Sequence, residues 1–148
     1  MYEKTLVAGW GDMDFNAHMR NTAYLDKSAD VRMMFFADHG FPMAEFMRLK
    51  IGPVVMKDEV TYFREFHLLD DVGVTMALAG LSDDGSRMVI RNEFFRKGTL
   101  AARVNSTVGW LDLTSRKLVR PPGALLQVMQ GLSRCDDFAD LPDSRSQG

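Results

Sequence analysis

Apolar and charged residues recur at helical spacing between residues 23 and 38. The apolar positions follow one another at steps of four and seven and are Leu25, Ala29 and Phe36. The charged positions share the other side and are Asp26, Lys27 and Asp30. This pattern predicts an amphipathic helix that packs one face on a core. A side-chain oxygen of Asn21 or Thr22 can cap its start, and Gly40 and Pro42 end it.

After Pro53 the pattern changes to the alternation that is typical of β-strands. It predicts strands over residues 54–63, 72–81, 87–96 and 100–113, and the chain opens with a shorter one over residues 4–10. The turns between the later strands have hairpin chemistry and are Ser82-Asp83-Asp84-Gly85 and Lys97-Gly98. Two shorter helices are predicted over residues 43–49 and 123–132.

This order of elements predicts the α+β class, with one long central helix wrapped by an antiparallel sheet of about five strands. We expect a single domain over residues 1–135 and a frayed, acidic C-terminal tail over residues 136–148. One sheet with one covering helix leaves a face or an edge that needs a partner, which favours a dimer.

Composition narrows the classes of protein that the chain can be. Its 148 residues suit one domain, and 46% of them are hydrophobic, as in an ordinary globular fold. No apolar run reaches the ~20 residues of a membrane span, and the first ten residues lack the apolar stretch of a secretory leader. The net charge of −2 argues against nucleic-acid binding. One cysteine, Cys135, allows no internal disulfide and favours a cytoplasmic location.

Common catalytic and metal-binding signatures do not occur. There is no G-x-S-x-G nucleophile elbow, phosphate loop or dinucleotide fingerprint, and the three histidines lack metal-ligand spacing. Asp12, Asp14 and Asn16 imitate the first positions of a calcium loop. However, Ala17 and Ala23 stand where the turn glycine and the bidentate glutamate belong. We therefore expect no bound metal and no cofactor.

Asp14 lies on a polar stretch seven residues before Asn21, which can cap the predicted long helix. The N–H groups of a helix's first turn lack backbone partners and carry the positive end of its dipole, so they can stabilise an oxyanion. A carboxylate on the preceding loop can reach the other side of the same carbonyl and activate a water or attack directly. The alternative is that Asp12 and Asp14 only satisfy turn amides.

Residues 10–32, WGDMDFNAHMRNTAYLDKSADVR, carry a motif at fixed spacing before and within this helix. Its positions are Asp14, His18, Asn21, Tyr24 and Arg32. This stretch resembles the opening motif of hotdog-fold acyl-CoA thioesterases of the 4-hydroxybenzoyl-CoA thioesterase type. The resemblance implies the hotdog fold over roughly residues 4–115. It also implies an acyl-CoA substrate, with coenzyme A as part of that substrate, and a homodimer or homotetramer with sites at subunit interfaces.

The resemblance also implies roles for individual residues. Asp14 would be the catalytic nucleophile or general base, and the backbone N–H of Asn21 would polarise the thioester carbonyl. His18 would shape the loop or orient water, or be purely structural. Arg32 is expected at the helix surface or in an interface ion pair. An acid that many relatives carry near this arginine is replaced here by Ala29. Residues 58–66 of a partner chain are expected to line the pocket.

Three other functions remain open at this point. The chain can be a thioesterase for acyl-carrier-protein thioesters or a hydratase of enoyl thioesters on the same fold. It can also be a non-catalytic module that binds acyl ligands. Release of free thiol separates the first two, and binding without turnover identifies the third.

Two features of composition bear on the substrate. Segment 87–103 holds five basic residues against Glu93 alone, and these are candidates for contacts with coenzyme A phosphates: Arg87, Arg91, Arg96, Lys97 and Arg103. Fourteen of the twenty-one Met and Phe residues lie between positions 13 and 66. Adaptable apolar side chains around the helix suit a lipid-like or aromatic acyl group, although most are expected to be core.

Overall fold

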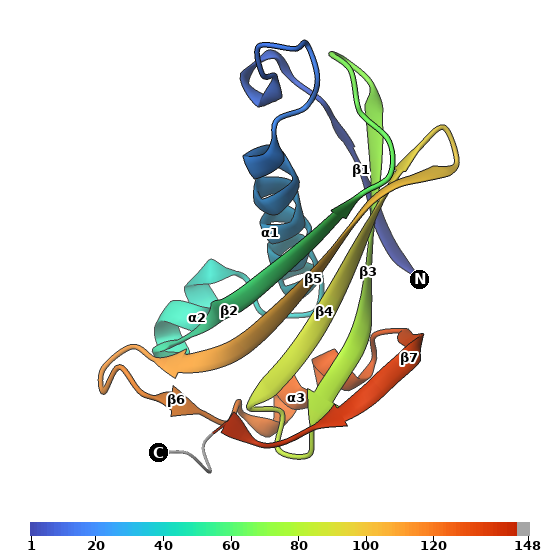
Figure 1. Ribbon diagram of the computed structural model, residues 1–148. Coiled ribbons are helices and arrows are strands. Elements are labelled where there is room, and N and C mark those ends of the chain that lie inside the picture. The colour runs from blue at the N-terminus through green and yellow to red at the C-terminus, as the bar shows by residue number, and fades with distance from the viewer. Residues whose placement is uncertain (145–148) are drawn as a thin grey trace.

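The computed structural model describes residues 1–144. Its central feature is a curved sheet that wraps around one long helix, α1 (Asn21–Asp38) (Figure 1). The main strands are β1 (Tyr2–Val7), β2 (Ile51–Tyr62), β3 (Asp71–Ser82), β4 (Arg87–Arg96) and β5 (Thr99–Asp112). They are hydrogen-bonded in the order β1-β3-β4-β5-β2, and every neighbouring pair is antiparallel. The expected α+β class and helix-on-sheet layout are confirmed.

The long helix begins two residues earlier than its apolar pattern predicts, and its cap differs. Arg20 is the N-cap residue and makes no side-chain cap bond, whereas Asn21 is the first helical residue. The Thr22 hydroxyl accepts a bond from Arg20 Nε at 2.8 Å instead of capping the helix. The helix ends at Asp38, before Gly40, which has a φ of 90°. The short helix predicted over residues 43–49 is confirmed as α2 (Met43–Leu49).

The buried face of α1 is not the predicted stripe. Leu25 and Ala29 are only half-buried, and of the predicted apolar set Phe36 alone is fully buried. The side chains that α1 buries are Ala23, Tyr24, Lys27, Ser28, Val31, Arg32, Phe35 and Phe36. The face is rotated because Lys27 and Arg32 find partners inside the fold, which offset the cost of burying their charges.

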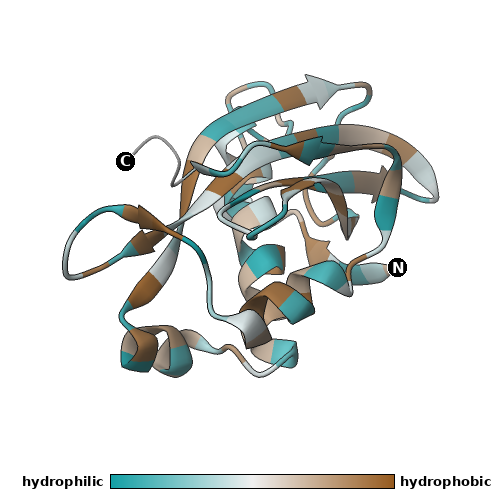
Figure 2. Ribbon diagram, turned by 90° about the horizontal axis from the view of Figure 1, so that it is seen from below, coloured by the Kyte–Doolittle hydropathy of each residue, from teal (hydrophilic) through white to brown (hydrophobic). Residues whose placement is uncertain are grey.

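Aromatic packing fills the core between α1, α2 and the sheet. Phe36 meets Trp110 of β5 edge to face at 5.6 Å, and Phe46 of α2 stacks on the same indole at 5.9 Å. The apolar bands of the strands alternate with polar ones, as expected for a sheet with one face on the core (Figure 2). Aromatic pairs of this kind contribute about 0.5–1.5 kcal/mol beyond the area they bury.

The sheet has seven strands rather than about five. The first strand spans Tyr2–Val7 rather than residues 4–10, and the chain then forms a short 3-10 helix, η1 (Trp10–Asp12). A two-residue strand, β6 (Leu118–Val119), pairs with β5. It leads to α3 (Gly123–Gln130), which ends two residues earlier than predicted.

The expected frayed tail is wrong for its first part. Residues 134–141 form β7 (Arg134–Leu141), which pairs with β3 in parallel on the same edge that β1 occupies further along. Arg91 of β4 and Asp137 of β7 form a two-bond ion pair at 2.9 and 3.0 Å. This pair and the backbone ladder compensate for the polar sequence of the strand. The remainder of the predicted tail, residues 145–148, lies outside the described residues.

Across residues 1–144, none of the helices combines the length and apolar character needed to cross a membrane.

Candidate active site

The motif of residues 10–21 forms the loop between β1 and α1, at one end of the molecule (Figure 1). Its backbone closes on itself, since the Asp14 N–H donates to the His18 carbonyl at 2.8 Å and the Arg20 N–H donates to that of Asp12 at 2.7 Å. Ala17 adopts a left-handed φ of 63° at the tip of this turn. The loop is therefore a tight, internally hydrogen-bonded hairpin that ends directly at the start of α1.

The Asp14 carboxylate serves the turn with one oxygen and leaves the other available. Oδ1 accepts the N–H groups of Asn16 at 2.8 Å and His18 at 3.1 Å. Among residues 1–144, no donor bonds to Oδ2, and the residue is exposed. The turn contacts therefore leave room for the expected catalytic role, which needs only the second oxygen. The two bonds to Oδ1 hold the carboxylate in a fixed orientation.

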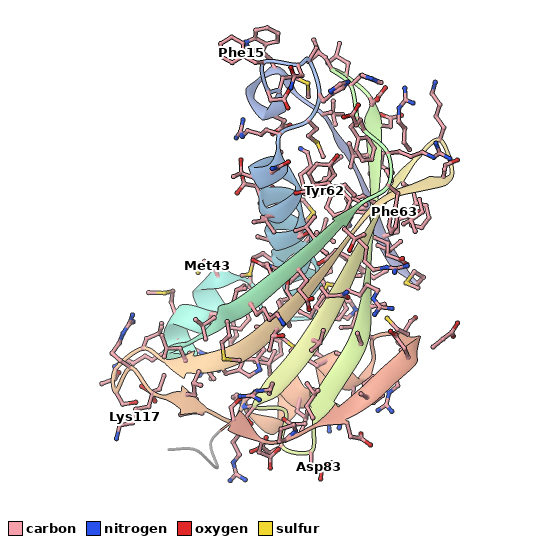
Figure 3. The ribbon with its side chains drawn as sticks, viewed as in Figure 1. Phe15, Met43, Tyr62, Phe63, Asp83 and Lys117 are labelled. Atoms are coloured by element: carbon pink, nitrogen blue, oxygen red, sulfur yellow. The ribbon has the colours of Figure 1, made fainter. Side chains whose placement is uncertain are left out.

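Asp14 lines an apolar hollow of about 610 Å³. The other residues that line it are Trp10, Met13, Phe15, Ala17 and Leu68. Trp10 is 81% exposed, and Phe15 projects fully into solvent at the tip of the loop (Figure 3). The hollow offers apolar walls with one carboxylate among them, which suits an uncharged reacting group attached to an apolar one.

His18 points toward a second loop rather than into this hollow. Its Nε2 lies 2.9 Å from Glu65 Oε2, and its ring lies 5.3 Å from that of His67. The main chain forms a bridge between these two histidines, and the Met19 N–H donates to the Phe66 carbonyl at 3.0 Å. His18 therefore joins the Asp14 loop to the segment that follows β2.

Asn21 is the first residue of α1, and it does not line the hollow that contains Asp14. It is exposed as the first residue of α1, and neither its N–H nor that of Thr22 bonds to an acceptor within residues 1–144. These N–H groups lie at the positive end of the helix dipole. Asp14 and these two N–H groups thus lie at opposite ends of one short loop, whereas the next N–H, that of Ala23, donates to the Arg20 carbonyl at 3.0 Å.

A partly buried ion pair joins the loop to α1, and the sequence pattern did not predict that Lys27, one of its members, is buried. Lys27 Nζ lies 3.0 Å from Asp12 Oδ2 and donates to the Val7 carbonyl at 3.1 Å. The same carboxylate oxygen accepts the Gly9 N–H at 2.8 Å. Burial acts to raise the pKa of Asp12, but the bonds from Lys27 and Gly9 prevail and lower it. Lys27 lies among charged neighbours in the sequence, so no local signal marks it as buried.

Tyr24 and Arg32, the two helix positions of the motif, are both buried. Burial, with Tyr62, Glu65 and Asp14 nearby, raises the pKa of Tyr24 to about 12. Arg32 is not a surface residue as expected. Its Nη1 donates to Ser106 Oγ at 3.2 Å, and that hydroxyl donates to Asp58 Oδ1 at 2.5 Å. Burial lowers the pKa of Arg32, and the nearby Asp58 carboxylate partly opposes this effect.

Most of the basic strip is already neutralised by neighbouring carboxylates. Arg91 pairs with Asp137, Arg96 with Asp70 and Arg103 with Glu93, at 2.7–2.9 Å. Arg87 Nε donates to the Ser144 hydroxyl at 3.1 Å. The strip is therefore mainly a set of ion pairs rather than an uncompensated basic patch. Over residues 1–144, no group of three or more His, Cys, Asp or Glu side chains is placed to hold a metal ion.

Comparisons with known proteins agree with this geometry. The family model of the thioesterase-like superfamily matches residues 8–129. No functionally curated protein matches the sequence at a significant level.

Solved structures with the same fold include a hypothetical protein from Staphylococcus aureus in complex with CoA. It is 22% identical, with 87% of this chain and 81% of that chain covered at a TM-score of 0.80. A 1,4-dihydroxy-2-naphthoyl-CoA thioesterase from Synechocystis is 13% identical. The match covers 88% of this chain and 96% of that chain, with a TM-score of 0.78. The dynemicin thioesterase is 22% identical. The match covers 89% of this chain and 96% of that chain, with a TM-score of 0.79.

Proposed function

The chain belongs to the thioesterase-like superfamily, and from this premise we propose that it hydrolyses an acyl-CoA thioester to the free acid and coenzyme A. The observation that carries the proposal is the Asp14 carboxylate, fixed through Oδ1 and available through Oδ2, in an apolar hollow on the loop that leads into α1. The similar structures that are named as CoA thioesterases support the same reaction. No cofactor is needed beyond the coenzyme A that the substrate carries, and the single cysteine suits the cytoplasm.

In this reaction Asp14 acts on the thioester carbon or on water beside it. As general base, Oδ2 takes a proton from water while the water oxygen bonds to the acyl carbon. As nucleophile, Oδ2 bonds to that carbon itself, and water later cleaves the mixed anhydride. In both routes the C–S bond breaks, the thiolate leaves as coenzyme A and takes up a proton. Both routes require one carboxylate oxygen with no other partner.

The first turn of α1 stabilises the charge that develops on the carbonyl oxygen. The N–H of Asn21 is the proposed donor, with the helix dipole adding to its effect. His18 acts as a positioning residue, because its contacts with Glu65 and the bridge to His67 hold the loop that carries Asp14.

The site is completed by a second copy of the chain. β2 is the terminal strand of the order β1-β3-β4-β5-β2, so no strand among residues 1–144 covers its outer edge. A second apolar row of α1, formed by Leu25, Ala29 and Met33, is half-buried. Ala29 and Met33 line a cavity of about 190 Å³ together with Val55 of β2. An open strand edge beside an incompletely covered apolar row is typical of a surface that pairs with its own copy.

Substitution of Asp14 tests the proposal most directly. Asp14→Asn keeps an oxygen that can accept the Asn16 and His18 N–H groups, so the loop should keep its shape while the base is lost. We expect kcat to fall about 10²–10⁴-fold in a thiol-release assay with a panel of acyl-CoAs. Asp83→Asn, on the exposed β3–β4 turn at the far end of the molecule (Figure 3), should leave kcat unchanged. Wild-type turnover by Asp14→Asn would refute the role of Asp14.

The same assay separates the other functions. Turnover of acyl-carrier-protein thioesters but not of acyl-CoA identifies the first alternative, and addition of water to an enoyl thioester without release of thiol identifies the second. Tight binding of acyl-CoA with no turnover identifies a non-catalytic module.

A further inference from the structure

Arg32 of α1 is a buried cation that forms a single hydrogen bond. The side chain is 9% exposed, and its Nη1 donates to Ser106 Oγ at 3.2 Å. Within residues 1–144, its Nε and Nη2 bond to no acceptor, and Asp58 reaches the guanidinium only through the Ser106 hydroxyl. By contrast, Lys27, the other buried cation of α1, pairs directly with Asp12. Because burying a charge costs folding free energy unless partners compensate it, Arg32 is left with an unmet requirement for an anionic partner.

This guanidinium lines the cavity of about 190 Å³ between α1 and the sheet. Among the described residues that line this cavity, Arg32 alone is polar, and the apolar walls come from α1, β2, β4 and β5, with Phe36 and Ile90 among them. Neither Nε nor Nη2 is fully enclosed by protein, so both donors are accessible to a ligand in the cavity. The cavity shares none of its described lining residues with the hollow that contains Asp14, and Arg32 lies three turns of α1, about 16 Å, from Asn21.

The unpaired edge of the Arg32 guanidinium fits a carboxylate. The Nε and Nη2 hydrogens of an arginine point the same way, so together they can donate two bonds to one carboxylate group. Arg103 uses the same two nitrogens to bind the Glu93 carboxylate, at 2.9 and 2.8 Å. One cation in an apolar wall favours a ligand with one negative charge, because a doubly charged anion such as sulfate would bury a charge that has no partner.

The volume and the walls of the cavity require an apolar body behind the carboxylate. An apolar cavity of about 150 Å³ is large enough to bind benzene, and the cavity beside Arg32 is somewhat larger. We propose that it binds a small apolar carboxylic acid of about the size of benzoate, with the carboxylate on Nε and Nη2 of Arg32 and the apolar body against the walls. This binding does not depend on the proposed hydrolysis, although the free acid that the hydrolysis releases belongs to the same class of ligand when its acyl group is small.

Titration calorimetry of the full chain with benzoate tests the site. Benzamide, which has the same ring without the charge, should bind the wild type at least about tenfold more weakly than benzoate, because the charge-assisted bonds are lost. Arg32→Met should weaken benzoate binding by a similar factor for the same reason. This variant should fold, since exchange of a buried charge for an apolar side chain of similar length is often neutral or stabilising. Arg32→Lys keeps the charge without the two-nitrogen edge and should bind with intermediate affinity.

Lys117→Met, the matched control, makes the same kind of change at an exposed cation on the β5–β6 turn (Figure 3) and should bind benzoate like the wild type. Asp14→Asn should also bind like the wild type, because Asp14 lines the other hollow. Binding that changes in Asp14→Asn but not in Arg32→Met would place the acid in that hollow and overturn the proposal.

Two other results would overturn it as well. The first is equal binding of benzoate and benzamide by the wild type. The second is no benzoate binding at millimolar concentration, and if Arg32→Met then also has a lower mass in light scattering, a second copy of the chain fills the cavity instead. Because these measurements need no turnover, they decide the site even if the thiol-release assay shows that the proposed hydrolysis is wrong.

Discussion

The ion pair between Lys27 and Asp12 should be the main anchor of the loop that carries Asp14. Asp12→Ala removes the carboxylate and leaves the Lys27 ammonium, which is 10% exposed, with only the Val7 carbonyl at 3.1 Å. It also removes the acceptor of the Gly9 N–H. Lys27→Met removes the cation and leaves the Asp12 carboxylate, which is 23% exposed and still bonded to Gly9. The two changes therefore differ in how much buried charge they leave uncompensated.

The expected magnitudes follow from this difference. Breaking a fully buried ion pair from one side costs about 3–5 kcal/mol of folding free energy. Because Asp12 keeps some solvent contact, we expect a loss of about 2–3 kcal/mol for Asp12→Ala and about 1–2 kcal/mol for Lys27→Met. The double variant leaves no unpaired charge and should be no less stable than Asp12→Ala alone. The coupling between the two changes should then be at least about 1 kcal/mol.

Urea unfolding of the wild type, both single variants and the double variant measures these free energies. The lowered pKa of Asp12 means that the pair's contribution is present above the unfolded pKa, near 4, and is lost as the pH falls through the folded pKa. Below about pH 4, wild-type stability should therefore fall more steeply than that of Lys27→Met. Additive losses in the cycle, or single losses below about 0.5 kcal/mol, would refute the anchor. If the pair anchors the loop that carries Asp14, Asp12→Ala and Lys27→Met should also lower kcat by a larger factor than they change KM.

Two further predictions concern the edges of the sheet. Val55→Glu places a charge on the exposed face of β2 beside α1 and should shift the assembly toward monomers in light scattering, with activity falling in parallel. An unchanged mass would contradict pairing through β2. Asp137→Asn removes the partner of Arg91 on β7, and because that carboxylate is 67% exposed and screened by solvent, the melting temperature should change little. A larger loss would mean that the pair, rather than the backbone ladder with β3, holds β7 in place.

The sequence pattern predicted the elements better than it predicted the faces they bury. The strand over residues 87–96 matches β4 residue for residue, since its alternation and flanking turns are local properties. The predicted buried face of α1 was wrong because Lys27 and Arg32 are buried with partners on other parts of the chain, Asp12 and Ser106. β7 was missed for a similar reason. Its acidic residues have no strand pattern, and its support comes from β3 and Arg91.

For the candidate site, too, the sequence predicted local features but not the contacts between distant parts of the chain. The start of the long helix was predicted to within two residues, because the start of a helix is a local feature, whereas the roles of Asp14 and Asn21 stay predictions. The resemblance placed residues 58–66 at a partner's pocket, and this expectation stays a prediction. The sequence does not show which arginines of segment 87–103 are neutralised, and only the folded chain shows that Arg91, Arg96 and Arg103 have carboxylate partners.

The contacts between the Asp14 loop and the segment after β2 have a consequence for how assembly and catalysis are linked. Glu65, Phe66 and His67 follow the last residue of β2 within five positions, and they hold His18 and Met19. The open edge of β2 and the Asp14 carboxylate are thus connected through these contacts. A partner that straightens or shifts the end of β2 moves the Asp14 loop with it. Subunit association would then set the catalytic geometry itself as well as supply a wall of the pocket.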